Sequence, residues 1–92
     1  MAGVNHTDCG MIRILFFGRP ADALGPERHL ALPEGGATVG DLRRILAATD
    51  TRAAEALLRP DVRASVDAVV VPEDTPVRPG QEVAYFSIFS GG

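Results

Sequence analysis

The residues of this 92-residue chain that are best suited to chemistry are its last three, Ser90, Gly91 and Gly92. Glycine has no Cβ, so a diglycine terminus is a thin segment that can carry the terminal carboxylate into a narrow channel. Such a carboxylate suits a reaction in which another enzyme activates and loads it. Since glycine makes up about 7% of average sequences, two terminal glycines arise by chance in about one chain in 200. The tail is therefore informative only on a scaffold that positions it.

The composition indicates a single folded domain. Hydrophobic residues make up 46% of the chain and charged residues 23%, and this length allows a core without metal or disulfides. The single cysteine, Cys9, excludes an internal disulfide framework and fits a reducing compartment. Apolar runs fall far short of the roughly 20 residues of a membrane span, and we find no signal peptide. The net charge of −3, without a basic cluster, argues against nucleic acid. We expect a cytoplasmic protein with neither a membrane nor a nucleic-acid partner.

All nine basic side chains are arginine, and the chain contains no lysine. The arginine and alanine content suggests a GC-rich genome as the cause. The chemical consequence is that no side-chain amine of this chain can attack an activated carboxyl terminus. The one amine left is the N-terminal α-amino group, with a pKa near 8.

Hydrophobic periodicity predicts a flexible extension over residues 1–10 and one domain over residues 11–92. The predicted elements are, in chain order, a buried strand at 11–17, a loop at 18–26, a strand at 28–32, a helix capped by Thr38, a short helix at 52–58, a strand at 63–71 that breaks near Asp67, a turn at 75–80 and a last strand at 82–89. Asp41 completes an approximate capping box with Thr38. The apolar stripe of the main helix comprises Val39, Leu42, Ile45 and Leu46.

Strands outnumber helices, and the main helix lies between two hairpin-like halves, so the fold class is α+β. A mixed sheet of four to five strands packed on one main helix is the β-grasp, or ubiquitin-like, architecture. The last strand should place Val83 and Tyr85 on one face and Phe86 and Ile88 on the other. Ile88 and Phe89 are adjacent, so one of them should lie outside the core. We expect Phe86, Ile88 and Phe89 to form a partner-binding surface, since aromatic anchors dominate interface energies.

The other candidate groups form no site. His6, His29 and Cys9 lack metal-ligand spacing, so we expect no metal. Gly35 and Gly36 precede a helix and could hold a phosphate, but a loop entering a capped helix is the better interpretation. A P-loop is excluded because the chain has no lysine. The side chains therefore contain no catalytic constellation.

Three segments resemble the small subunit of molybdopterin synthase, the MoaD-type sulfur carriers of the MoaD/ThiS ubiquitin-like family. They are MIRILFFG at the start of the domain, TVGDLRRIL on the helix, and DTPVRPGQEVAYF followed by the diglycine, and the resemblance covers residues 11–92. Two segments depart from the family pattern: Ser87-Ile88 stands where two prolines are common, and Arg19–Asp22 differs from the usual opening loop.

The resemblance implies a carrier cycle in molybdenum cofactor biosynthesis. An E1-like adenylating enzyme would use ATP to adenylate the Gly92 carboxylate, and a sulfurtransferase or cysteine desulfurase would convert it to a thiocarboxylate. The tail would then donate sulfur to the pterin precursor in the large synthase subunit. The chain would bind no cofactor itself and would be a subunit of a sulfurtransferase that is not catalytic alone.

Other functions stay open on the sequence. The chain could carry sulfur for another pathway, such as thiazole, cysteine or a thiolated metabolite. It could also be a ubiquitin-like modifier attached through Gly92 to lysines of target proteins. A final option, which involves no chemistry at the tail, is a β-grasp interaction module whose diglycine is accidental.

Overall fold

Five strands form one mixed sheet in the order β2-β1-β7-β4-β5. The computed structural model describes residues 10–88, and the chain's other residues lie outside it. The strands of this sheet are β1 (Met11–Phe17), β2 (Glu27–Ala31), β4 (Val62–Val66), β5 (Val69–Val71) and β7 (Glu82–Ser87). Strands β1 and β7 are parallel, and the remaining pairs are antiparallel. The central strand β7 is therefore the one that leads to the tail.

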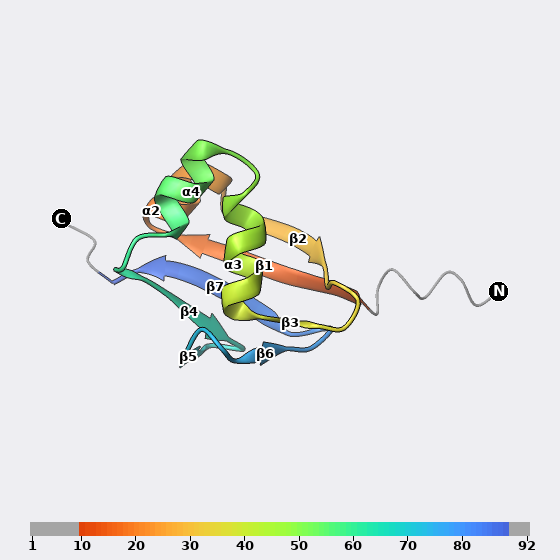
Figure 1. Ribbon diagram of the computed structural model, residues 1–92. Coiled ribbons are helices and arrows are strands. Elements are labelled where there is room, and N and C mark those ends of the chain that lie inside the picture. The colour runs from red at the N-terminus through yellow and green to blue at the C-terminus, as the bar shows by residue number, and fades with distance from the viewer. Residues whose placement is uncertain (1–9, 89–92) are drawn as a thin grey trace.

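Within residues 11–88, three helices and a small second sheet complete the β-grasp fold (Figure 1). The helices are α2 (Arg19–Leu24), α3 (Val39–Ala47) and α4 (Thr51–Leu57), and the second sheet pairs β3 (Ala37–Thr38) with β6 (Pro76–Val77). Figure 1 shows α3 crossing the sheet, with α2 and α4 side by side at the end where β1 and β7 finish. None of the helices in the described part of the chain is long and apolar enough to cross a membrane.

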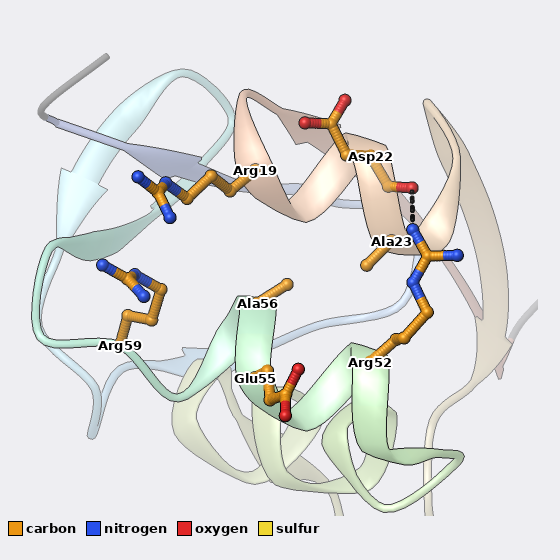
Figure 2. A pocket seen from close by; sticks show the side chains of 7 residues that line it. All are labelled: Arg19, Asp22, Ala23, Arg52, Glu55, Ala56 and Arg59. Carbon is orange, nitrogen blue, oxygen red and sulfur yellow. Dashed lines mark hydrogen bonds between the residues drawn. The ribbon is translucent and has the colours of Figure 1, made fainter. Parts of the chain in front are cut away.

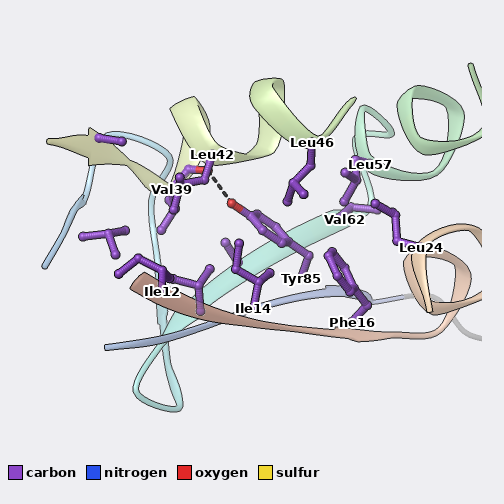
Figure 3. Close-up of a cluster of buried hydrophobic side chains, with 14 of the residues drawn as sticks. Ile12, Ile14, Phe16, Leu24, Val39, Leu42, Leu46, Leu57, Val62 and Tyr85 are labelled. Carbon is purple, nitrogen blue, oxygen red and sulfur yellow. Dashed lines mark hydrogen bonds between the residues drawn. The ribbon is translucent and has the colours of Figure 1, made fainter. Parts of the chain in front are cut away.

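The core lies between α3 and one face of the sheet (Figure 3). Alternation along β1 buries Ile12, Ile14 and Phe16, as the sequence predicts. Val83 and Tyr85 of β7 are fully buried on the same face, and the rings of Phe16 and Tyr85 stack with centroids 6.2 Å apart. The predicted mixed sheet of four to five strands packed on one main helix is confirmed, and the sheet has five strands.

Helix α3 begins at the predicted cap. The Asp41 N–H donates to Thr38 Oγ1 at 3.0 Å, and the Thr38 N–H donates to the Asp41 carboxylate at 3.0 Å, a complete capping box. The backbone bond from Thr38, followed by the hydrogen bond from the Arg44 guanidinium, holds the pKa of the Asp41 carboxyl below its usual range. The predicted apolar stripe is wrong at Ile45, which is 40% exposed. Arg43 occupies the inward-facing direction instead.

The predicted loop at 18–26 is also wrong, because residues 19–24 form α2. Pro20 lies in the first turn of α2, where a missing N–H costs nothing, and Gly25 ends the helix with a φ of 88°. Pro20 indicates a helix start here rather than a break. The predicted turn at 75–80 likewise contains the two-residue strand β6. The predicted break in the strand at 63–71 is confirmed at Asp67 and Ala68, which join β4 to β5.

Candidate functional site

The structure describes the chain as far as Ile88, the residue after β7. The predicted tail residues Ser90, Gly91 and Gly92 and the predicted docking residue Phe89 lie outside the described residues. The candidate site within the described part is therefore the segment from which the tail departs, residues 86–88, which we call the tail root.

The tail root is held between two strands. Phe86 is in register with Phe17 of the parallel strand β1, and Ser87 is in register with Val62 of the antiparallel strand β4. The Ile88 N–H donates to the Asp61 carbonyl at 2.9 Å. The segment that leads to the tail is therefore held on both sides, by β1 and by β4 with the residue before it.

The outer face of the sheet, opposite the helices, presents apolar side chains around the tail root. Ile88 is 44% exposed and Phe86 is half-buried, as the alternation with the buried Val83 and Tyr85 predicts. Neighbouring residues in register extend this surface, which we call the outer apolar patch; its members are Leu15, Phe17, Ala84, Phe86 and Ile88. Phe17 is 54% exposed. Sequence reasoning did not single it out, although its alternation with Phe16 was a sufficient signal.

Arginines flank the tail root on the side of the helices. Arg19 of α2 and Arg59 of the loop before β4 line an open cavity of about 250 Å³ between α2 and α4. Figure 2 shows their guanidinium groups turned toward one another across this cavity. Arg59 also pairs with the Asp61 carboxylate at 3.3 Å, next to the carbonyl that holds Ile88. Asp22 and Glu55 line the same cavity, so charges of both signs lie beside the tail root.

A second arginine feature was missed at the sequence level. Arg43 is 7% exposed, and its Cζ lies 5.5 Å from the centroid of the Tyr85 ring. The Tyr85 hydroxyl in turn donates to the Val39 carbonyl at 2.6 Å. Burial raises the pKa of Tyr85 above its usual range, while Arg43 opposes this effect, so the phenol is neutral. The position of Arg43 four residues after Val39 was the available signal, because that spacing shares one helix face.

The groups excluded at the sequence level stay outside any site in the described residues. His29 is exposed and lies 2.8 Å from the Glu27 carboxylate, whose pKa is lowered first by Arg13 and then by His29. No cluster of three or more potential metal ligands occurs in residues 10–88. Gly35 and Gly36 both have a φ near 90° and form a turn, which explains the glycines without a phosphate. His6 and Cys9 lie outside the described residues.

The model of the ThiS family matches residues 14–92, most of the chain. No curated protein matches the sequence. Similar solved structures include SAMP1, a small archaeal modifier protein of Haloferax volcanii, which is 21% identical with a TM-score of 0.72 and is aligned over 90% of this chain and 100% of that chain.

Two further neighbours are described as molybdopterin converting factors. The putative molybdopterin converting factor subunit 1 of Pyrococcus furiosus is 24% identical over 85% of this chain and 97% of its own, with a TM-score of 0.70. The complex of subunits 1 and 2 of the molybdopterin-converting factor of Helicobacter pylori contains a chain that is 18% identical, covering 89% of this chain and 99% of that chain, with a TM-score of 0.62. At these identities, the similarities establish the fold.

Proposed function

This chain belongs to the ThiS family, and from that premise we propose that it is a sulfur carrier whose Gly92 carboxylate is the group that reacts. The single observation that supports this most is that Ser90-Gly91-Gly92 follows the central strand of the sheet after only two residues of sequence. A carrier needs a rigid body for partners to recognise and a slender segment that enters their active sites. The anchored tail root and the diglycine meet these two needs.

The chemistry of loading follows from the poor electrophilicity of a carboxylate. The Gly92 carboxylate attacks the α-phosphorus of ATP on an activating enzyme, and pyrophosphate leaves. A persulfide sulfur of a sulfurtransferase or cysteine desulfurase then attacks the acyl carbon, and AMP leaves. A thiol cleaves the resulting acyl disulfide by thiol–disulfide exchange, which yields the thiocarboxylate and a new disulfide. This chain supplies the carboxylate and the surface that the enzymes hold.

We propose that the loaded carrier delivers its sulfur within the large subunit of molybdopterin synthase. The pterin precursor bound there is the final sulfur acceptor. The Helicobacter pylori neighbour is described as a complex of subunits 1 and 2, which supports a large subunit as the partner. The outer apolar patch is the docking surface that we propose for it, since Phe86 and Ile88 of the tail root are members of this patch. Phe89 remains a predicted member of this surface.

A protein modifier is the second candidate function. The small archaeal modifier protein shares the fold, and a modifier would use the same adenylate but transfer Gly92 to amines of target proteins. Carriers for thiazole, cysteine or another thiolated product are a third group with the same loading chemistry.

The deciding experiment loads the chain with an activating enzyme, ATP and a sulfur source and measures its intact mass. We expect a mass increase equal to the exchange of one oxygen for sulfur, located on Gly92. A chain lacking Gly92 should fold normally and gain nothing. Sulfur loading of that truncated chain would refute the proposal, and adducts on lysines of cell proteins, in place of loading, would favour the modifier.

A further inference from the structure

The buried Arg43 side chain of α3 links parts of the fold that are distant in sequence. Its Nη1 donates to the Leu57 carbonyl at 2.9 Å, and its Nη2 donates to the Val62 carbonyl at 3.0 Å. Nη2 also contacts the Glu73 carboxylate at 2.7 Å, and this carboxylate is the more exposed partner of the pair. Arginine is rarely so buried unless it is paired, so this arrangement calls for a specific reason.

The two carbonyls that accept from Arg43 stand at the two ends of one loop, residues 58–61. Leu57 is the last residue of α4, and Val62 is the first residue of β4. Inside the loop, the Val62 N–H donates to the Arg59 carbonyl at 3.1 Å. A guanidinium is a planar fork with fixed donor directions, so its two bonds constrain the separation of these carbonyls. Arg43 therefore holds both ends of the loop in place.

This same loop holds the tail root. Its Asp61 carbonyl accepts the hydrogen bond from the Ile88 N–H, and Val62 is in register with Ser87. After Ile88, four residues lead to the terminal carboxylate, a reach of roughly 13 Å when extended. A change in the direction of the chain at Ile88 would thus displace the Gly92 carboxylate. The displacement would be several times larger than the misplacement that reacting atoms tolerate.

We propose that Arg43 is a positioning residue for the tail, acting through the 58–61 loop to fix the direction in which the chain leaves the sheet at Ile88. This inference rests on the proposed function for its consequence, the presentation of the Gly92 carboxylate. The effect of Arg43 on the chain at Ile88 can be tested on the Ile88 amide alone, without any sulfur chemistry.

The first test measures hydrogen exchange of the Ile88 and Tyr85 amides in the free protein by NMR. Tyr85 lies within β7 and Ile88 directly follows it, so the Tyr85 rate reports opening of the strand and a rise in the Ile88-to-Tyr85 ratio reports opening confined to Ile88. Arg43→Met removes both loop-holding bonds while keeping an apolar stem, and we expect the ratio to rise by about ten-fold through local opening. If Arg43→Met does not fold, Arg43→Lys replaces it, because a compact ammonium lacks the planar fork.

Two control variants separate positioning from ordinary destabilisation. Leu46→Ala removes core packing from the same helix without removing a bond to the loop, and Glu73→Gln keeps the two carbonyl contacts of Arg43 while deleting the charge partner. Neither should raise the Ile88-to-Tyr85 ratio by more than about two-fold, because a loss of global stability speeds Tyr85 exchange at least as much as Ile88 exchange. An equal rise in Leu46→Ala and the Arg43 variant would overturn the inference.

The second test uses the activating enzyme and follows sulfur loading of the same variants. We expect the Arg43 variant to lose about ten-fold or more in kcat with little change in KM, since the folded body that the enzyme binds is intact and the carboxylate is misplaced. If kcat is unchanged although Ile88 exchange is faster, the 58–61 loop does not control the presentation of the Gly92 carboxylate, and the inference is overturned. If the Arg43 variant shows faster Ile88 exchange but the wild-type protein accepts no sulfur, the structural role of Arg43 is supported and the proposed function is refuted.

Discussion

The Tyr85 hydroxyl on the central strand donates a 2.6 Å hydrogen bond to the Val39 carbonyl in the first turn of α3 (Figure 3). This bond ties the strand that bears the tail to the main helix across the core. Replacing Tyr85 with phenylalanine keeps the ring and leaves the buried carbonyl without this donor. We expect a loss of about 1–2 kcal/mol in the free energy of unfolding, measured by urea titration. A loss below the experimental error would show that the bond contributes nothing net.

The raised pKa of Tyr85 predicts a specific dependence of stability on pH. The folded state holds the phenolic proton above pH 10, where the unfolded state releases it, so the folded state binds more protons and stability falls as pH rises. Tyr85 is the only tyrosine and the chain has no lysine, so few other groups titrate there. Urea titrations between pH 9 and about 11 should show this fall in wild type and not in Tyr85→Phe. The same slope in both proteins would assign the effect to another group.

Because the outer apolar patch is the proposed docking surface and lies on the outer face of the sheet, substitutions in it should weaken partner binding without lowering the stability of the fold. Phe17→Ala and Phe86→Ala should each weaken binding to the large subunit by about 2 kcal/mol, roughly 30-fold in Kd, because Phe86 belongs to the tail root and Phe17 is in register with it. Isothermal calorimetry and thermal melting measure the two effects. Val69→Ala is the matched control, since Val69 is an exposed apolar residue on the edge strand β5, and its binding should be unchanged. Equal affinity for Phe17→Ala and wild type would remove β1 from the interface.

The arginines beside the tail root predict electrostatic steering toward an acidic partner surface. The double variant Arg19→Gln and Arg59→Gln should slow association with the activating enzyme about ten-fold at low salt. The difference should disappear near 1 M salt, where the Debye length is about 3 Å. Arg78→Gln, at the far end of β7, should associate at the wild-type rate. Stopped-flow measurements that show no salt-dependent difference would contradict steering by these groups.

The absence of lysine predicts that an activated carrier stays monomeric. No side-chain amine of a second copy can attack the Gly92 adenylate or thiocarboxylate, and the α-amino group is only partly deprotonated at pH 7. Incubation with the activating enzyme and ATP, followed by a reducing denaturing gel, should show no ladder. Abundant multimers cross-linked away from residue 1 would contradict this expectation.

Much of the fold can be predicted from local patterns in the sequence, such as alternation along a strand and capping residues at a helix start. Alternation along residues 11–17 determines which face of β1 is buried, and the pair Thr38 and Asp41 determines where α3 begins. The exposure of Ile88 follows from the same period of two. Each of these depends on side chains only a few residues apart, so neighbouring sequence suffices to predict them.

The sequence by itself determined the β-grasp elements, the position of the diglycine after the last strand and the apolar character of the segment before it. The tertiary structure decided which distant residues support that segment: Phe17 beside Phe86, the 58–61 loop at Ile88, and Arg43 behind the loop. It also turned residues 19–24 into a helix packed on α4 and left Ile45 exposed. These outcomes depend on register and burial between segments far apart in the chain, and periodicity within one segment contains no information about them.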